Sequence, residues 1–456
     1  MTLPFTELLK KYDVPVPRYT SYPTVPAWSV TPSSEEWIQS IKTSLAKDDS
    51  SWSLYLHLPF CETLCTFCGC NTIITKDHGK SNPYIDLILK EWELYLEKVP
   101  ELSQKKLKHL HLGGGTPTFL SATELTRLIE SLFTKIQKTE KDFEASIEVD
   151  PRRTTEDQLI ALKKLGFTRV SMGVQDFNYE VQRLIHREQP FDITEKLTIK
   201  ARQLGYQSVN FDLIYGLPQQ TKERMIQTIE QTLLLRPDRI AFYSFALVPW
   251  IKPAQRLFKD SDLPTPAEKR ELYEVAREMF LKAGYQDIGM DHFALPEESL
   301  SLARQNKKLH RNFMGYTDQK TDLLLGLGVS SISETENHFH QNEKLLPKYE
   351  QLVKAGEIPT HRGHVLSLRD REQKRKILQM MTQYEYHWES AQEFETMKTN
   401  FAELASEGLV EVDQQKVKVT EAGHPFLRNI CSVFDDYLKR SDMPIKPTDG
   451  QFSKSI

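Results

Sequence analysis

Short apolar runs alternate with helix-like stretches along residues 51–250 of the chain. The runs are rich in Val, Ile, Leu and Phe, which is typical of parallel strands that are buried on both faces. They are SLYLHLPF (53–60), LKHLHLGGG (107–115), ASIEVDP (145–151), RVSMGVQD (169–176), SVNFDLIYGLP (208–218) and RIAFYSFALVP (239–249). This order of strands and helices predicts a parallel α/β sheet with right-handed crossovers.

The stretches between these runs have the composition and the end signals of helices. Three begin after a Ser, Thr or Asn residue that can cap a helix, and two end at Gly. The predicted helices are NPYIDLILKEWELYLEKV (82–99), ATELTRLIESLFTKIQK (122–138), TTEDQLIALKKLG (154–166), EKLTIKARQLG (195–205) and KERMIQTIEQTLLL (222–235).

Polar or special residues recur at the end of every predicted strand. They are the segment from Cys61 onward, Gly113 to Thr116, Glu148 and Asp150, Gln175 and Asp176, Asp212, and Ala246 to Pro249. A doubly wound sheet would spread these positions along a line, whereas a barrel gathers the carboxyl ends of its strands around one mouth. We therefore favour a partial (β/α)6 TIM-like barrel over the doubly wound sheet.

The length of 456 residues suggests two or three structural units. Residues 1–50 carry PVPRYTSYPTVPAW, which is unsuited to a long helix and predicts an N-terminal arm or lid. Residues 51–362 contain the barrel with an extension near the substrate. Residues 363–456 predict a small, mostly helical C-terminal domain of winged-helix-like type, with LVEVDQQKVKVTEAG as a hairpin that turns at 413–415.

Composition and charge exclude several classes of protein. The chain is 39% hydrophobic and 27% charged, and its net charge of −4 provides no general attraction to nucleic acid or to anionic membranes. No segment has the 18 or so apolar residues of a membrane span, and the N-terminus lacks the order of a signal peptide. We expect a cytoplasmic protein, in which clustered cysteines bind metal or do chemistry more often than they form disulfides.

Four of the five cysteines lie within CETLCTFCGC, residues 61–70. A structural zinc site usually takes four N or S ligands in two separated pairs, and here only His57 and His78 could complete the set. A thioredoxin-type pair would need a C-x-x-C motif at the start of a helix, and Cys65 and Cys68 do not directly precede a helix. Cysteine thiolates can also hold an iron–sulfur cluster.

Three thiolates on one loop would leave one iron of a 4Fe–4S cluster without a protein ligand. Such an open position is typical of a catalytic site, whereas structural and electron-transfer sites close it. The C-x₃-C-x₂-C spacing of Cys61, Cys65 and Cys68 resembles the signature of the radical SAM enzymes, in which S-adenosylmethionine (SAM) chelates the open iron.

The resemblance extends from residue 17 to the C-terminus. It is carried by PRYTSYPT (17–24), YLHLPFC (55–61), CTFCGCN (65–71), HLGGGTPT (111–118), SIEVDPR (146–152), SMGVQDFN (171–178), NFDLIYGLP (210–218), IGMDHFA (288–294), LHRNFMGYT (309–317) and RNICSVFD (428–435). Together these segments resemble the oxygen-independent coproporphyrinogen III oxidases. This resemblance implies that a 5′-deoxyadenosyl radical initiates oxidative decarboxylation of two of the four propionates of coproporphyrinogen III to vinyl groups, giving protoporphyrinogen IX for haem biosynthesis.

The resemblance also implies the cofactors and their ligands. Cys61, Cys65 and Cys68 would bind a [4Fe–4S] cluster, and Tyr55, Gly114 and Glu148 would contact the SAM bound to it. A second SAM site would involve Phe67, Gly115, Thr116, Gln175, Arg187, Asp212, Ala246 and Ile332. No residue is assigned as catalytic, because the radical does the chemistry.

Cys70 is expected not to bind the cluster, because a fourth cysteine ligand would exclude SAM; a supporting role is possible. The C-G-C ending also favours an oxidase over a related haem chaperone, which is the alternative function. Arg18, Arg152 and Arg311 are candidates for pairing with substrate carboxylates. The resemblance implies a monomer that uses an electron donor and an electron acceptor, neither of which the sequence identifies.

Overall fold

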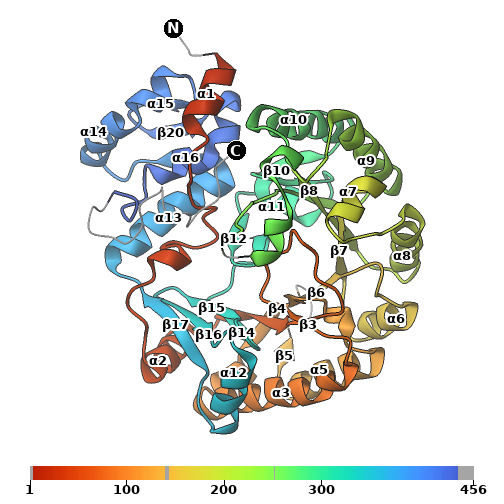
Figure 1. Cartoon of the computed structure of the whole chain (residues 1–456). Helices are drawn as coiled ribbons and strands as arrows, with labels where there is room; N and C mark the ends of the chain where they lie inside the picture. The colour runs from red at the N-terminus through yellow and green to blue at the C-terminus, as the bar shows by residue number, and fades with distance from the viewer. Residues whose placement is uncertain (1–3, 139–142, 251, 440–456) are drawn as a thin grey trace.

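The protein is built around one large, strongly curved sheet (Figure 1). The computed structural model describes residues 4–138, 143–250 and 252–439. Six strands match the predicted apolar runs: β1 (Ser51–Leu58), β4 (Lys106–Gly114), β6 (Glu144–Val149), β7 (Arg169–Gln175), β8 (Ser208–Tyr215) and β9 (Arg239–Ser244). They pair in parallel in this order, as the alternation of strands and helices predicts.

A seventh parallel strand, β14 (Leu323–Leu327), lies on the free side of β1. The antiparallel strands β15 (Ile332–Thr335), β16 (His338–Asn342) and β17 (Thr360–Val365) continue the sheet beyond β14. At the opposite end, β11 (His292–Ala294) and β10 (Gln286–Gly289) extend it beyond β9. Within the described ranges the end strands β10 and β17 do not pair, so the sheet is a partial barrel.

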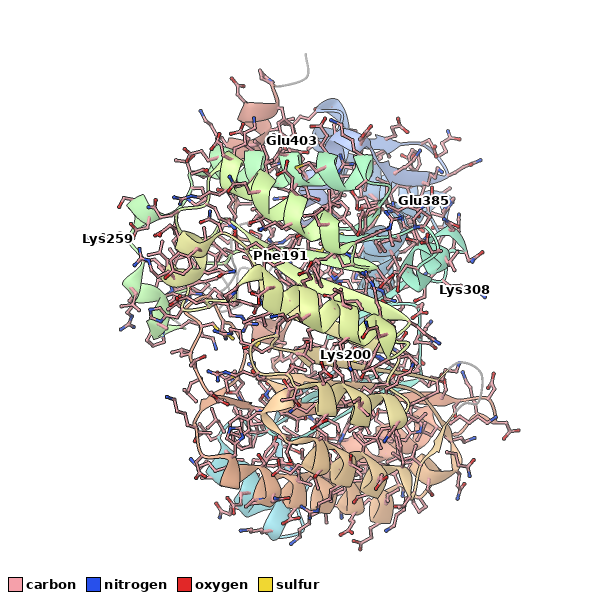
Figure 2. The ribbon with its side chains drawn as sticks, turned by 90° about the vertical axis from the view of Figure 1, so that its right-hand side faces the viewer. Phe191, Lys200, Lys259, Lys308, Glu385 and Glu403 are labelled. Atoms are coloured by element: carbon pink, nitrogen blue, oxygen red, sulfur yellow. The ribbon has the colours of Figure 1, made fainter. Side chains whose placement is uncertain are left out.

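Helices cover the outside of the sheet, and Figure 2 shows them side by side along one flank, with Lys200 on the outer surface of α8. They are α3 (Ser81–Lys98), α5 (Ala122–Phe133), α6 (Glu156–Lys164), α7 (Tyr179–Leu184), α8 (Phe191–Gln203), α9 (Lys222–Leu235) and α10 (Pro266–Lys282). The prediction of a helix over 122–138 is wrong at its end. The helix stops at Phe133, because the last two residues of the pattern form β5 (Gln137–Lys138) beside β4.

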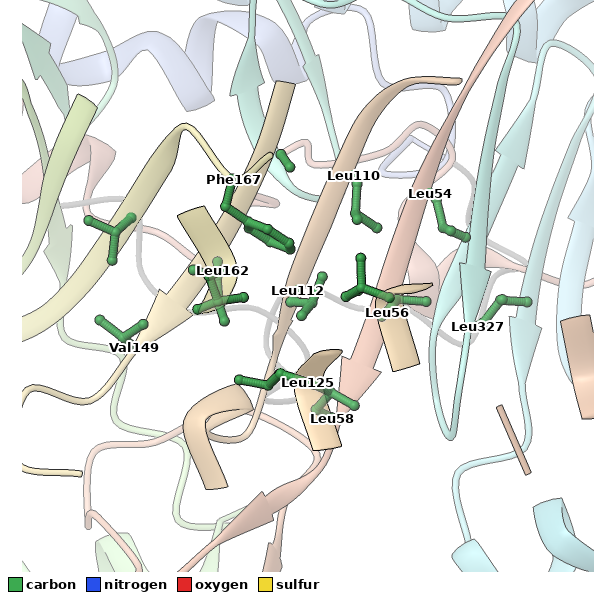
Figure 3. Close-up of a cluster of buried hydrophobic side chains, with 14 of the residues drawn as sticks. Leu54, Leu56, Leu58, Leu110, Leu112, Leu125, Val149, Leu162, Phe167 and Leu327 are labelled. Atoms are coloured by element: carbon green, nitrogen blue, oxygen red, sulfur yellow. The ribbon is translucent and has the colours of Figure 1, made fainter. Parts of the chain in front are cut away.

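The two faces of each barrel strand differ in chemistry. Leu54, Leu56 and Leu58 of β1 point outward with Leu110 and Leu112 of β4, and all five are fully buried under the helices (Figure 3). Burial of a leucine side chain stabilises the fold by about 1.5–3 kcal/mol. This apolar outer face therefore fastens the helices to the sheet.

The inner face of the barrel is polar, which the richness of the strands in apolar residues did not predict. Alternate residues along each strand face inward. These inward positions include Tyr55 and His57 of β1, His109 and His111 of β4, Ser146 and Glu148 of β6, Ser171 of β7, and Asn210 and Asp212 of β8. Many are joined by hydrogen bonds, so the barrel interior can hold a polar ligand.

Residues before β1 divide between two hydrophobic clusters. α1 (Phe5–Tyr12) contributes Leu8 and Leu9 to a cluster with C-terminal residues, whereas α2 (Ser34–Ser44) contributes Trp37 and Ile41 to the barrel core. The segment between α1 and α2, which includes PVPRYTSYPTVPAW, contains no α-helix, as expected from its sequence.

The C-terminal region combines helices with a small three-stranded sheet. Its elements are α13 (Leu368–Gln383), β18 (Glu385–His387), α14 (Ala391–Asn400), α15 (Ala402–Ser406), β19 (Val410–Val412), β20 (Lys416–Val419) and α16 (Leu427–Ser432). The predicted hairpin is β19–β20. Residues 440–456 of the predicted C-terminal domain lie outside the described residues, and the domain limits stay predictions. None of the described helices is long and apolar enough to span a membrane.

Candidate active site

The cysteine segment begins where β1 ends and passes through β2 (Phe60–Cys61) to β3 (Ile73–Ile74). Cys61, Cys65, Cys68 and Cys70 all line one cavity of about 280 Å³ at the carboxyl ends of the barrel strands. All four are free thiols; Cys65 is buried and Cys70 is exposed. The predicted metal ligands are therefore brought to a single cavity.

Each of the three predicted ligand sulfurs lies beside a hydrogen-bond donor. The hydroxyl of Thr116 is 3.3 Å from the Cys61 sulfur, and the backbone N–H of Cys70 donates to the Cys68 sulfur at 3.4 Å. Arg152 and Arg187 each place a guanidinium nitrogen 3.8 Å from the Cys65 sulfur.

The same residues do not suit one zinc ion. In the described part of the chain, no three His, Cys, Asp or Glu side chains are grouped around a single metal position. His57 donates from Nε2 to the carbonyl of Asn71 at 2.9 Å and accepts from Tyr55 at Nδ1. His78 contacts the Phe119 carbonyl at 3.0 Å and Glu62 at 3.2 Å. Both candidate histidines are thus occupied. Three cysteine thiolates instead suit an iron–sulfur cluster, in which each iron takes one cysteine sulfur besides the sulfides of the cluster.

The glycines after β4 allow the backbone to lie against the cysteine segment. A Cβ on Gly114, whose φ is +111°, would come within 2.7 Å of the His57 ring. A Cβ on Gly115 would come within 2.6 Å of the Pro59 carbonyl group. Since neither position tolerates a side chain, the two glycines define one wall of the cavity.

Glu148 lies at this wall, with its carboxylate 3.3 Å from the Gly114 N–H and 3.4 Å from Nε2 of His111. Burial opposes ionisation of Glu148, but the hydrogen bond and charge of His111 outweigh it and lower the pKa of the carboxyl. Tyr55 stacks on His111 with ring centroids 5.9 Å apart and does not line the cavity itself. Glu148 is therefore a carboxylate ready to accept hydrogen bonds from a ligand.

A buried ion-pair network lies behind Cys65. Asp150 accepts a hydrogen bond from Arg152 at 2.8 Å and forms an ion pair with Arg187 at 3.0 Å. Burial opposes ionisation of Asp150, but the charge of Arg187 and the hydrogen bond of Arg152 outweigh it, so the pKa of Asp150 is lowered. Arg187 also donates to the carbonyl of Gly173 at 2.7 Å. Arg152 is committed to Asp150 and Cys65, which leaves it poorly placed for the substrate carboxylate that the sequence suggested.

Asp212 provides a second carboxyl group in the cavity. It accepts from Ser171 at 3.0 Å and from Asn210 at 2.9 Å. Burial, followed by the negative charge of Glu148, raises the pKa of Asp212 to about 7. At neutral pH this group is therefore close to half-protonated and can donate as well as accept a hydrogen bond.

The structure brings most of the predicted cofactor contacts to this cavity. Its lining includes Cys61, Phe67, Cys65, Cys68, Gly114, Gly115, Thr116, Glu148, Gln175, Arg187 and Asp212. Ala246 does not line it, and its carbonyl accepts from the Gln255 side chain at 3.2 Å. Ile332 lies on β15 opposite Gln341 and also does not line the cavity.

The sequence placed Asp150 at a strand end beside the barrel mouth, where it lines the cavity, but it did not indicate Tyr243, which lines the cavity as well. Asp150 follows the strand residues Glu148 and Val149, and Tyr243 faces inward on β9. The period of two along a strand could have indicated Tyr243, because Arg239 and Ala241 share its face. Nothing in the sequence indicated that Asp150 pairs with two arginines.

Comparisons with known proteins agree with this geometry. Residues 55–232 match the model of the radical SAM superfamily. A protein of Escherichia coli named oxygen-independent coproporphyrinogen III oxidase is 40% identical over 98% of both chains. A protein of the same name from Pseudomonas aeruginosa is 37% identical over 95% of both chains. The solved structure of the E. coli coproporphyrinogen III oxidase, described as a radical SAM enzyme, covers 96% of this chain at 39% identity with a TM-score of 0.88.

Proposed function

The chain belongs to the oxygen-independent coproporphyrinogen III oxidase family of radical SAM enzymes, and from this premise we propose how its cavity decarboxylates coproporphyrinogen III. The enzyme is an oxidoreductase of haem biosynthesis that yields protoporphyrinogen IX. Its cofactors are a [4Fe–4S] cluster and SAM. Each vinyl group forms when a propionate loses a β-hydrogen atom, CO₂ and one electron, and this happens at two of the four propionates.

The observation that carries the proposal is the grouping of three free thiols at one cavity beside Gly114 and Glu148. When bound, the reduced cluster and SAM supply the 5′-deoxyadenosyl radical that removes the hydrogen atom. Cys61, Cys65 and Cys68 would hold the cluster, with Arg152 and Arg187 stabilising the charge on the Cys65 sulfur. Cys70 also lines the cavity and is the most exposed of the four thiols, and its exclusion from the ligand set rests on the iron position that SAM needs.

Glu148 and Gly114 would orient SAM. The carboxylate of Glu148 accepts hydrogen bonds, and His111 keeps it ionised. The Gly114 backbone approaches a ligand closely because it carries no side chain. Tyr55 would affect SAM only indirectly, by holding the His111 ring, since it stacks on that ring and does not line the cavity.

A second SAM in the same cavity is a further proposal. Phe67, Gly115, Thr116, Gln175, Arg187 and Asp212 line the cavity and support it. The half-protonated carboxyl of Asp212 suits ribose hydroxyls, which both donate and accept. Ala246 and Ile332 lie outside the lining, so their part in this site depends on a rearrangement when the cofactors bind. A monomeric state and a cytoplasmic location stay predictions from the sequence.

An anaerobic assay with coproporphyrinogen III, SAM and a reductant tests the function. We expect protoporphyrinogen IX and 5′-deoxyadenosine, with about four irons per chain in the purified protein. The haem-chaperone alternative predicts haem binding without turnover, and it is not favoured because the full-length relatives are named as oxidases. A content of about one zinc per chain and no iron would contradict the proposal.

A further inference from the structure

Arg311 is a buried cation, and two of its guanidinium nitrogens have no hydrogen-bond partner among the residues that the structure describes. It lies on β12 (His310–Asn312), which pairs with β13 (Gly315–Thr317) in a hairpin between the barrel and α13 (Figure 1). The residue is only 8% exposed, and neither Nε nor Nη1 of its guanidinium has a hydrogen-bond partner. Its guanidinium stacks on the Tyr316 ring at 4.5 Å, which leaves those N–H groups unsatisfied. Buried charges are normally paired, so an anion is missing here.

A continuous set of aromatic rings leads from Arg311 to the cofactor cavity. The Tyr316 ring lies 5.2 Å from His292, and the His292 ring lies 5.7 Å from Tyr243. Tyr243 lines the cavity, and the Arg18 guanidinium lies 5.6 Å from its ring centroid. Arg18 is therefore one ring contact from a residue of the cavity wall and Arg311 is three contacts from it, although neither arginine lines the cavity itself.

Positive charge exceeds negative charge around these residues, which we call the arginine cluster (Arg18, Asp291, Arg311 and Arg428). Arg18 forms an ion pair with Asp291, whose other oxygen accepts from His292 at 2.8 Å. Arg428 donates to the backbone carbonyls of Val16 and Pro17. The positive charges of Arg18 and Arg311 both act on the Asp291 carboxylate and lower its pKa. These two guanidinium groups therefore share one carboxylate.

We propose that Arg311, assisted by Arg18, binds a propionate carboxylate of the substrate that is not decarboxylated. This inference rests on the proposed function, in which two of the four propionates stay intact. A guanidinium fork pairs with a carboxylate through two hydrogen bonds, and Arg311 has two such N–H groups to offer. Holding an unreactive propionate at this place would present another propionate to the radical, because binding at a distance orients the reacting group.

Binding of the fluorescent porphyrin coproporphyrin III tests this proposal when it is compared with binding of its uncharged tetraamide. We expect the wild-type enzyme with its cluster to bind the tetra-acid more tightly than the tetraamide. Arg311→Met should lower this preference about tenfold and change the affinity for the tetraamide little, since roughly that factor is typical of one charge-assisted pair. Arg311→Lys keeps the charge without the fork and should retain part of the preference.

Arg304→Met is the control, because Arg304 stacks on Tyr384 at 4.9 Å in the same way, but the next ring after Tyr384 is His424 and not the His292–Tyr243 pair that leads to the cavity. It should leave the preference unchanged. Iron content and circular dichroism verify that each variant is folded and carries its cluster, and Arg311→Lys replaces Arg311→Met if the latter does not fold.

An unchanged preference in the folded Arg311 variants overturns this inference alone. Wild-type enzyme that neither binds the tetra-acid nor converts coproporphyrinogen III overturns the proposed function as well.

Discussion

The cofactor cavity and the arginine cluster both adjoin Tyr243, but they balance buried charge in different ways. In the cavity, Asp150 is shared by Arg152 and Arg187, and these arginines also face the Cys65 sulfur. In the arginine cluster, Arg311 has no partner for two of its nitrogens. The first region is complete before its ligands bind, whereas the second is complete only with an added anion.

The thiols of the cavity should give the largest effect. Replacing Cys61, Cys65 or Cys68 with Ser removes a cluster ligand, and we expect loss of both the iron and the formation of 5′-deoxyadenosine. Iron analysis and anaerobic activity measure this outcome. Cys70→Ser is the control and should keep near wild-type iron content and cluster spectrum, since a fourth cysteine ligand would leave SAM no iron to chelate. Loss of iron in Cys70→Ser would show that it is a ligand.

The paired charges of the cavity are tested by Asp150→Asn. Removing this buried carboxylate leaves two guanidinium groups without their anion, which typically costs about 3–5 kcal/mol of unfolding free energy. Anaerobic urea unfolding measures the loss. Asp192→Asn is a matched control on the surface, where Asp192 pairs with Lys196, and should change stability little. A similar stability for both variants would mean that the network is not balanced as described.

The excess charge of the arginine cluster is tested by Asp291→Asn. Burial opposes ionisation of Asp291, but the charges of Arg18 and His292 outweigh it and hold the pKa of the carboxyl well below its ordinary value. Neutralising this anion frees Arg18, so the preference for tetra-acid over tetraamide coproporphyrin should increase several-fold. Fluorescence titration measures it. A weaker preference would indicate that Asp291 orients Arg18 for the substrate and does not compete with it.

The last test concerns pH. Because the pKa of Asp212 is raised to about 7 in the folded protein, the folded state binds a proton between pH 4 and 7 that the unfolded chain does not hold. This group therefore stabilises the fold at low pH, and its contribution is lost as the pH rises to 7. Asp212→Asn should be more stable relative to wild type at pH 8 than at pH 5. Equal differences at both pH values would contradict the raised pKa.

The barrel strands and the cysteine site could be predicted because their signals are local. The helix over 222–235 matches its sequence pattern residue for residue, and C-x₃-C-x₂-C selects, within eight residues, three cysteines that line one cavity. β14 was not assigned, because Leu323–Leu327 is a plain apolar run whose partner, β1, lies far away in the chain. The helix predicted to residue 138 ended early because pairing with β4 outweighed local propensity.

The polar contacts of the site could not be predicted, because the residues that form them lie far apart in the chain. Cys65 meets Arg152 and Arg187, which are separated from it by 87 and 122 residues, and nothing near the cysteines specifies these partners. Arg152 and Arg311 were equal candidates for substrate carboxylates in the sequence. Folding distinguishes them, since Arg152 meets Asp150 and Arg311 meets a tyrosine ring.

The parallel pairing of β1 with β14 has a consequence for synthesis of the chain. β1 and the cysteine segment leave the ribosome early, but Leu323, the partner of Trp52, is made roughly 270 residues later. At about 5–20 residues per second, one edge of β1 stays open for tens of seconds. An exposed strand edge invites pairing with other chains during that time. The nascent chain therefore needs protection at β1 until its last parallel strand arrives.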